Sequence, residues 1–515
     1  MTNTGIDPIT LEIIWTRLIS LVDEAAVTLV RTSFSTIVRE SNDYAVVLLD
    51  RDCQLLAQSS LSIPSFICTL PRTVRHLLEA FPRETLVPGD VLITNDPWLG
   101  TGHLPDINVT MPIFRGKEVV GFSATVAHAP DIGGRLRSPS NRELFEEGLR
   151  IPPSALIRGG KTNDTLVDVI RANVRVPDQV MGDLWAQVAA NRMLGRHLLD
   201  MLEETRVDLP AIGREMYGRA EAAMRNAIRA LPDGDYSYEA SVDGFIEPVT
   251  IRCSIEVRDD AIRIDYTGST PQLPKAINVV PIYTFAYSAY ALKCVLSPNI
   301  PNNEGSFRSI ETYAPLGSIL NPRFPAAVSA RAMTGHLLPT VIMGALSQAI
   351  PDKVRAASGS PLWCVQMAGS NSGQSFAATF FLNGGQGAGQ AGDGLPALSF
   401  PSNLANTPIE VLEAQVPIRI ARRALRRGTG GAGSRCGGDG QVFEFDILAD
   451  APVTVSFMAD RRRNAAPGLL GGEPGATGNV LLDNKPIDPR EIIIVQPGAR
   501  ITLETPGGGG FGKAI

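Results

Sequence analysis

The sequence predicts a multi-domain α+β fold: a mixed N-terminal α/β region with long helices, followed by a β-rich C-terminal region. Its 515 residues exceed what one hydrophobic core organises, and 44% hydrophobic with 19% charged residues is typical of a well-buried globular protein. Apolar residues recur at helical spacing over much of the first half and with a period of two further on. Glycine and proline are concentrated after residue 380, the clearest change in composition.

The N-terminal region begins with a helix that Pro8 opens and that ends near Ser33. After the polar segment Arg39 to Asp43, a hairpin follows, with strands at residues 44–50 and 54–60. Residues 70–81 have helical spacing. Val91 to Thr94 form a short apolar strand.

Two more strands, at residues 108–114 and 118–129, are joined by the turn Arg115-Gly116-Lys117. On the second strand apolar residues alternate along one face, and His128 ends that face. A strand end is a rigid platform for a ligand. Residues 163–231 are then predicted to be helical, most regularly over 178–204.

The period changes near Leu231-Pro232-Asp233-Gly234, so we place a domain boundary there and expect three domains, at residues 1–232, 233–350 and 351–515. The middle domain is predicted to be mixed α+β, with three antiparallel strands within 236–268 and helices at 276–294 and 329–350. The C-terminal domain is expected to be glycine-rich and β-rich. Its apolar runs lie at residues 442–448, 453–459, 479–482, 492–495 and 501–505.

The bulk composition excludes several classes of function. A net charge of −6, with only the short, interrupted basic cluster Arg422 to Arg427, argues against a general nucleic-acid binder. The six cysteines form no C-x-x-C pair, which favours free thiols in a reducing compartment. The N-terminus has no basic signal-peptide region and no run of 18 apolar residues occurs, so we expect a soluble, cytoplasmic protein without a membrane span.

The C-terminal glycine motif does not predict a phosphate-binding loop. The tail Gly507 to Ala514 matches G-x-x-x-x-G-K, but it lacks the following Ser/Thr and the helix that a phosphate loop needs. If ATP is used, another chain is expected to bind it. The runs at 384–394 and 428–440 are explained equally well by tight turns or by close approach of the backbone to a ligand or partner. No G-x-S-x-G elbow occurs.

The stretch Asn95 to Gly134 is the candidate metal site. His103 and His128 are each followed three residues later by an aspartate, Asp106 and Asp131, and prolines before these aspartates favour bent backbone. Imidazole with carboxylate is the ligand mixture that binds Zn, Mn or Fe(II). Alternatively, His103 caps a turn and His128 is a core histidine. Of the other histidines, His197 is expected on a helix surface, and the role of His336 stays open.

These residues belong to a set of segments in which the chain resembles the hydantoinase B/oxoprolinase family. This family comprises the B-type subunits of ATP-dependent hydantoinases, 5-oxoprolinases and the related acetone and acetophenone carboxylases. The resemblance runs over nearly the whole chain, and the segments follow one another in the family's order. They are DPITLEIIWTRL, RTSFSTIVRES, NDPWLGTGHLPD, EEGLRIPP, VMGDLWAQVAANR, DYTGSTPQ, IPNNEGSFRSI, APLGSILNPRFPAAV, NTPIEVLE, GTGGAGSRCGGDG and TPGGGGFG.

The resemblance implies a metal site as well. In the carboxylase branch a divalent metal, manganese in acetone carboxylase, is held by a Glu, two His and an Asp. Placed on this chain, these ligands are Glu40, His103, Asp106 and His128. Such an ion can polarise an acyl oxygen and lower the pKa of water. Asp96, Asp131 and Glu147 are then candidate acid/base or ligand-orienting groups.

The resemblance further implies a larger A-type ATPase partner that binds ATP, a small-molecule substrate, and a hetero-oligomer with at least two copies of each subunit. Our leading hypothesis is a B subunit of an ATP-dependent cyclic amide hydrolase. A ketone carboxylase subunit is the second hypothesis, and a non-catalytic structural subunit is the third. The chain departs from the family at Gly389, where an Arg is frequent, and at Thr334-Gly335-His336, where T-S-Q is usual, so the substrate is left open.

Overall fold

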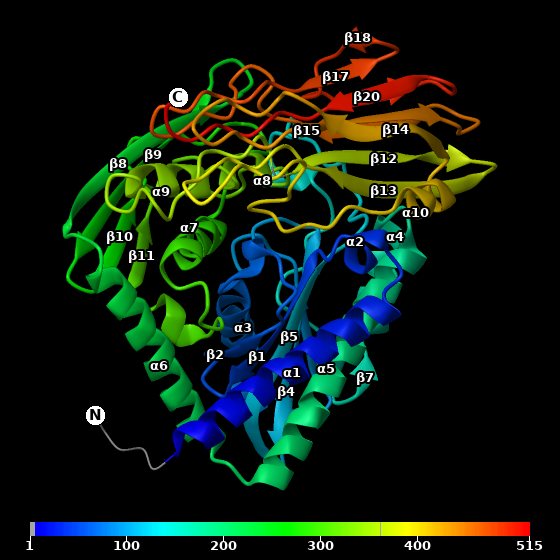
Figure 1. Cartoon of the computed structure of the whole chain (residues 1–515). Helices are drawn as coiled ribbons and strands as arrows, with labels where there is room; N and C mark the ends of the chain where they lie inside the picture. The colour runs from blue at the N-terminus through cyan, green and yellow to red at the C-terminus, as the bar shows by residue number, and fades with distance from the viewer. Residues whose placement is uncertain (1–5, 361, 515) are drawn as a thin grey trace.

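Residues 6–360 and 362–514 are described by the computed structural model, which is built from helices and several antiparallel sheets (Figure 1). The predicted α+β class is therefore confirmed. Among the described residues, no helix is both long and apolar enough to cross a membrane. Each sheet lies within one of the ranges 1–232, 233–350 and 351–515. The domain boundaries themselves stay a prediction.

A seven-stranded antiparallel sheet forms the N-terminal part, in the order β2-β1-β5-β4-β3-β6-β7. The hairpin, the short apolar strand and the strand that ends at His128 are all found where the sequence predicts them. The strands are β1 (Tyr44–Asp50), β2 (Leu55–Gln58), β3 (Val91–Thr94), β4 (Asp106–Arg115), β5 (Glu118–His128), β6 (Ser154–Arg158) and β7 (Lys161–Thr162).

Long helices cover one face of this sheet. In Figure 1, α1 (Pro8–Thr32) and α5 (Pro177–Thr205) cross the sheet side by side, and one core cluster joins them to α6 (Leu209–Arg229) and to β1. Asp7 caps α1 by accepting hydrogen bonds from the backbone N–H groups of Ile9 and Thr10, and proline fills the first turn. The helices α2 (Thr36–Arg39) and α4 (Asp164–Asn173) complete this part.

The opposite face of the sheet packs in a second core cluster with α3 (Thr69–Ala80) and α7 (Pro281–Leu296). Almost all of β5 is consequently buried on both faces, and not on one face alone as a simple alternation implies. Val126 and Ala124 belong to this second cluster, and His128 follows them on the same face. The strand thus delivers His128 into the interior of the molecule.

The middle part is a four-stranded sheet in the order β11-β10-β9-β8, with β10 and β11 parallel. Its strands are β8 (Gly234–Val242), β9 (Val249–Arg258), β10 (Ala261–Asp265) and β11 (Ile310–Tyr313). The single helix predicted at 329–350 is wrong, because it is divided into α8 (Ala332–Gly335) and α9 (Leu338–Leu346). Pro339, in the first turn of α9, has no backbone N–H to continue the earlier helix.

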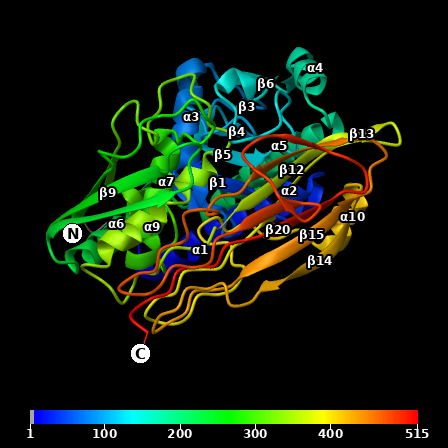
Figure 2. The same cartoon turned by 90° about the horizontal axis from the view of Figure 1, so that it is seen from above.

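Two sheets form the C-terminal part, in the orders β13-β12-β16-β19 and β14-β15-β20-β17-β18 (Figure 2). The five apolar runs become strands, whereas β12, β13, β14 and β18 were not predicted. The strands are β12 (Trp363–Asn371), β13 (Gln374–Leu382), β14 (Ile418–Arg426), β15 (Gly440–Ile447), β16 (Val453–Met458), β17 (Asn479–Leu482), β18 (Lys485–Pro486), β19 (Ile493–Val495) and β20 (Arg500–Glu504), with the helix α10 (Ile409–Gln415). They enclose a third core cluster.

The glycine-rich runs form a layer of backbone packed on backbone. Figure 2 shows these loops running side by side toward the C-terminus. Gly438 N donates to Gln386 O at 2.8 Å, and Gly508 N donates to Gly438 O at 2.9 Å. A Cβ on Gly508 would lie 2.1 Å from Gln386 O, and none of Gly507 to Gly510 has a positive φ. Gly507 to Gly510 are therefore needed for close approach of the chain to itself and not for tight turns.

Candidate metal centre

Three buried side chains converge at the open end of the β4–β5 pair. His103, Asp106 and His128 each offer one ligand atom, and these atoms all lie within 4.8 Å of one another. Asp106 is the first residue of β4 and lies directly opposite His128, the last residue of β5. His103 precedes Asp106 by three residues in a bent segment, where Asp106 N donates to His103 O at 3.4 Å. The strand register thus brings two of the ligands together, and the turn brings the third.

A fourth residue, the acidic Asp43, lies beside this group just before β1. His128 N donates to Asp43 O at 3.1 Å, which continues the β1–β5 ladder by one residue. Asp43 Oδ2 lies 3.7 Å from His128 Nδ1, and the Asp43 side chain lines the same cavity as the three other groups. Two carboxylates and two imidazoles therefore line one cavity, although only His103, Asp106 and His128 have ligand atoms that all lie within 4.8 Å of one another.

The hydrogen bonding of His103 fits a cation. Its Nδ1 lies 3.1 Å from Ser329 O, and because a carbonyl only accepts, Nδ1 carries the proton. The bare Nε2 then faces Asp106 Oδ1 at 2.7 Å and has no hydrogen-bond partner among the described residues. Two lone pairs at this distance repel one another unless a cation lies between them. This donor set, with its orienting carbonyl, suits a divalent metal ion.

His128 is oriented by an arginine. Arg137 Nη1 lies 3.3 Å from His128 Nε2, and because a guanidinium only donates, that nitrogen accepts and the proton of a neutral His128 lies on Nδ1. Nδ1 faces Asp106 Oδ1 at 3.0 Å. Binding of a cation at Nδ1 would displace this proton, so metal uptake is expected to release a proton.

The electrostatics keep the ligands in their binding forms. Burial, together with the charge of Arg331, holds the pKa of His103 well below its usual range, so the imidazole is neutral. Burial alone would raise the pKa of Asp106, but the charge of Arg331 and the hydrogen bond from His128 act against it, and that pKa lies well below its usual range. Burial raises the pKa of Asp43 to about 6, with partial compensation by His128. A neutral imidazole beside an ionised carboxylate is the state that binds metals.

Residues 328–331, which we call the 328–331 loop, form hydrogen bonds with His103, Asp106 and Arg137. Ser329 O accepts hydrogen bonds from His103 Nδ1 and from Arg137 Nε, the latter at 2.9 Å. Arg331 Nη2 donates to Asp106 Oδ2 at 2.7 Å, and its guanidinium lies over the ring of Tyr283. Glu147 Oε1 accepts from the N–H groups of Val328 and Ser329 at 2.9 and 2.8 Å. Burial raises the pKa of Glu147 to about 8.

The four groups line one small cavity. All three parts of the chain close it: the N-terminal sheet supplies the acidic and imidazole groups, and the middle part supplies Arg331 and two tyrosines. The C-terminal part supplies Leu362, Phe381 and Leu404. Since both arginines that line the cavity are buried, it can accept an anionic group beside the metal ligands.

Comparison with known proteins gives the chain its family. The family model for hydantoinase B/oxoprolinase matches residues 7–514. The chain belongs to the hydantoinase B/oxoprolinase family. It is 31% identical to the B subunit of a putative D-/L-hydantoinase from Pseudomonas sp. (strain NS671), over 99% of this chain and 90% of that protein. It is 30% identical to the beta subunit of the caprolactamase of Pseudomonas jessenii, over 99% and 91%.

Solved structures agree with this assignment. The ATP-dependent caprolactamase from Pseudomonas jessenii superposes with a TM-score of 0.90 at 28% identity, covering 99% of this chain and 91% of that chain. A nucleotide-free acetone carboxylase superposes with a TM-score of 0.89 at 19% identity, over 99% and 76%, which is a likeness of fold. The caprolactamase thus has the same α+β architecture as this chain.

The other site residues that the sequence predicted do not line the cavity. Glu40 lies at the end of α2, where its nearest ionic partner is Arg39 at 3.8 Å, and it is not among the cavity-lining residues. Asp96 Oδ2 pairs with Arg150 Nε at 2.6 Å. Asp131 Oδ1 pairs with Arg175 Nη1 at 2.6 Å. Asp43 therefore lines the cavity and Glu40 does not, and Asp96 and Asp131 form ion pairs.

Sequence reasoning missed three residues of the cavity: Asp43, Arg137 and Arg331. A signal existed for Asp43, because it directly precedes a predicted strand, and pairing that strand with 118–128 places it beside His128. Arg331 follows Asp106 by 225 residues in the chain, and no local pattern connects the two. Glu147 was singled out, but its place behind the 328–331 loop depends equally on tertiary structure.

Proposed function

We propose that this chain is the B-type subunit of an ATP-dependent cyclic amide hydrolase and binds a divalent metal ion through His103, Asp106 and His128. The observation that carries the proposal is the buried group of these three residues, with an unpartnered Nε2 on His103. The names of the relatives support the reaction class, since they include the B subunit of a hydantoinase and the beta subunit of a caprolactamase.

Asp43 is the fourth ligand in this proposal, in place of Glu40. With Asp106 it gives two carboxylate charges to the ion, and the two imidazoles complete a donor set suited to Mn, Zn or Fe(II). Such an ion supplies Lewis acidity, which polarises an acyl or phosphoryl oxygen and lowers the pKa of water. Glu147 is a positioning residue that holds the 328–331 loop, and Asp96 and Asp131 are structural.

The two buried arginines are proposed to bind the phosphoryl group of the activated substrate. Arg137 and Arg331 bring two positive charges to the cavity wall, and Nε of Arg331 has no hydrogen-bond partner among the described residues. Guanidinium groups bind phosphate and carboxylate oxygens strongly. They would hold and orient a phosphoryl group on an amide oxygen, the activated form of the substrate. Burial of the cavity by the C-terminal part would keep bulk water from that group.

Phosphorylation of the amide is assigned to a partner. The relatives are named as subunits, and the A-type ATPase of the family would bind ATP and activate the small-molecule substrate. We expect a hetero-oligomer with at least two copies of each subunit. The cytoplasm is the proposed location, since the six cysteines form no disulfide in the structure.

The test is a substrate panel with the purified complex. We expect ATP-dependent ring opening of hydantoins, 5-oxoproline or lactams, at least about 100-fold slower in Asp106→Asn and His128→Ala. His197→Ala is the matched control, because His197 lies on a helix surface with Glu24 at 3.2 Å, and it should keep wild-type activity. Bicarbonate-dependent turnover of a ketone would instead identify the chain as a carboxylase subunit. Full activity of both site variants would support the third hypothesis, a non-catalytic structural subunit.

A further inference from the structure

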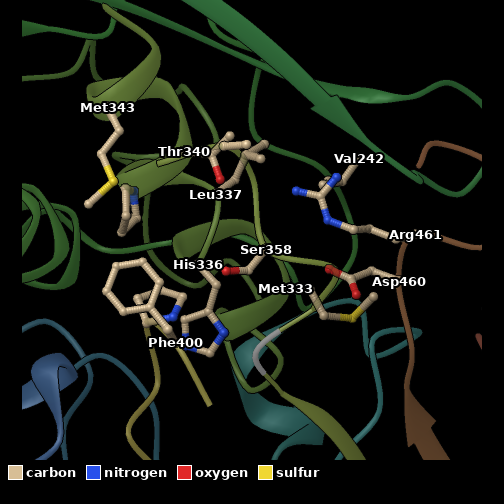
Figure 3. Close-up of a pocket in the computed structure, with 13 residues that line it drawn as sticks. Val242, Met333, His336, Leu337, Thr340, Met343, Ser358, Phe400, Asp460 and Arg461 are labelled. Carbon is tan, nitrogen blue, oxygen red and sulfur yellow. The ribbon is translucent and has the colours of Figure 1, made fainter. Parts of the chain in front are cut away.

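A pocket of about 160 Å³ lies where the middle part of the chain meets the C-terminal part. The loop after β8 and the helix α8 line it from one side, and the segment 459–463 with Arg490 lines it from the other. We call it the Arg462 pocket. Val242 and Met333 also line the small pocket beside His336 (Figure 3). Of the residues that the structure describes, none lines both the Arg462 pocket and the metal cavity, so this is a separate site.

The one carboxylate in the described lining of this pocket, Asp243, is engaged within the protein. Its oxygens accept hydrogen bonds from the backbone N–H groups of residues 462–464, at 2.6 to 3.1 Å. These bonds hold the C-terminal segment against the loop after β8. The carboxylate therefore fixes the shape of the pocket, and the charge offered to a ligand comes from other residues.

Those other residues are three arginines, Arg462, Arg463 and Arg490. Arg490 forms a close ion pair with Asp488. Arg462 has only a 4.0 Å contact with that same carboxylate, and no described carboxylate lies within 4.0 Å of the Arg463 guanidinium. Two guanidinium charges at this pocket are therefore poorly neutralised by the protein, which favours an anionic ligand.

Two buried donors at the pocket are left unpaired. Nε of Arg462 and the hydroxyl of Thr334 have no hydrogen-bond partner among the described residues, and Thr334 is only 1% exposed. An N–H or O–H group that is buried without an acceptor is unfavourable. A ligand that brings acceptor oxygens to these groups would be stabilised.

The rest of the wall is apolar. Phe245 lies under two cations, with Lys275 Nζ at 4.4 Å and the Arg490 guanidinium at 5.8 Å from the centre of its ring. The other apolar lining residues are Val242, Ile277, Met333 and Ala459. Apolar walls with a few polar groups, at a junction between parts of a chain, are typical of small-molecule sites. An anion with a short apolar body covers this wall, whereas a bare inorganic anion does not.

We infer that the Arg462 pocket binds a small organic anion, whose oxygens accept from Arg462 and Thr334 and whose apolar chain packs on Phe245 and Met333. Carboxylates and phosphate monoesters share this chemistry, because both form charge-assisted hydrogen bonds with guanidinium groups. Opening of a cyclic amide yields a carboxylate, so the proposed function would supply one source. The inference itself does not depend on that function.

The experiment compares hexanoate with hexanamide, a neutral compound of the same shape, by ligand-observed NMR titration of the purified chain. We expect hexanoate or hexyl phosphate to bind at least about 10-fold more tightly than hexanamide, the effect of hydrogen bonds to a charged group. The tighter of these two anions identifies the head group, carboxylate or phosphate, that the pocket takes.

Variants locate the binding. Arg462→Gln removes a charge and the unpaired Nε, and should weaken binding of the preferred anion at least about 10-fold. Thr334→Val removes only the hydroxyl and should weaken it about 2- to 10-fold, without lowering the melting temperature of the free chain, since that hydroxyl has no partner. The control Arg252→Gln removes an exposed arginine that pairs with Glu239, and binding should be unchanged.

Three results would overturn the inference. They are equal affinity of wild type for both anions and hexanamide, full affinity in Arg462→Gln and Thr334→Val, and binding that is lost in Arg137→Gln but kept in Arg462→Gln, which would place the anion in the metal cavity. If Arg462→Gln does not fold, Thr334→Val still decides. Anion binding without ATP-dependent turnover would keep the pocket and reject the hydrolase, whereas turnover without anion preference would do the reverse.

Discussion

One carbonyl oxygen, Ser329 O, orients two side chains of the metal centre. It accepts from His103 Nδ1 and from Arg137 Nε, and so fixes the tautomer of one imidazole directly and contacts the other through the arginine. Ser329 itself is held by Glu147, whose Oε1 accepts from the Ser329 N–H at 2.8 Å. At the scale of single residues, we therefore expect the proposed metal affinity to depend on Glu147, which does not line the cavity.

Replacing Glu147 tests this dependence. Glu147→Ala leaves the N–H groups of Val328 and Ser329 buried and unpaired, and we expect a 10- to 100-fold loss of metal affinity, roughly the effect of removing an orienting partner. Glu147→Gln keeps an acceptor oxygen and should retain most of the affinity. Competition with a fluorescent chelator measures both. Wild-type affinity in the alanine variant would show that the 328–331 loop does not position the ligands.

The same residue predicts a pH dependence of stability. Burial raises the pKa of Glu147 in the folded chain to about 8, above its value in the unfolded chain. Ionisation is therefore easier in the unfolded state, and the folded state loses stability as the pH rises from about 4.5 to 8. We expect the melting temperature of Glu147→Gln, relative to wild type, to rise across this window. A difference that is constant with pH would contradict the assignment.

At the scale of elements, the glycine-rich runs are a structural layer. Gly437 and Gly508 belong to different runs, and a Cβ on Gly437 would lie 2.0 Å from Gly508 O. The two backbones cannot separate without breaking the ladder in which Gly431 N donates to Gly508 O at 2.8 Å. The runs end at the C-terminal sheets that cover the metal cavity, so their packing supports that cover.

Alanine substitutions in the glycine-rich runs test whether a glycine is needed for close packing of two backbones. Gly508→Ala would force a methyl group against a carbonyl oxygen, and we expect a loss of at least about 3 kcal/mol or failure to fold. Gly392→Ala, in the run 384–394, meets nothing within 4 Å and should be close to wild type. The stabilities of the two variants are compared by their apparent melting temperatures. Equal stability of the two variants would contradict the packed layer.

Local patterns predicted the elements well where one period extends over many residues. The helix 178–204 and the strand ending at His128 are examples, because their apolar spacing is regular. The single helix predicted at 329–350 was wrong, because it is interrupted at His336 and Leu337, just before Pro339, which has no N–H to continue the earlier helix. The glycine runs could not be interpreted from the sequence, because close approach between runs far apart in the chain leaves no local pattern.

At the scale of the whole molecule, the candidate site is assembled from three distant parts of the chain. The N-terminal sheet supplies His103 and Asp106, the 328–331 loop supplies Arg331, and the C-terminal part closes the cavity. The local part of the site, His-x-x-Asp followed by a strand-end histidine, could be predicted. Its arginines could not. The resemblance placed the fourth ligand at Glu40, whereas Asp43 and not Glu40 lines the cavity.

Assembly with a partner is the prediction at this scale. When the chain is co-expressed with an A-type ATPase of its family, we expect light scattering to show one complex that holds at least two copies of each chain. Hydrolysis of ATP stimulated by a cyclic amide should require both proteins, because the glycine tail of this chain packs on its own backbone. Stimulated ATP hydrolysis by this chain alone would contradict the division of labour.

The central claim is that His103 and its neighbours hold a divalent metal ion, and metal content tests it most directly. The purified complex is analysed by inductively coupled plasma mass spectrometry as wild type, His103→Ala, Asp43→Asn, Glu40→Gln and the control His197→Ala. We predict about one divalent ion per chain in wild type, Glu40→Gln and His197→Ala, and little in His103→Ala and Asp43→Asn. Unchanged metal content in His103→Ala would contradict the metal centre.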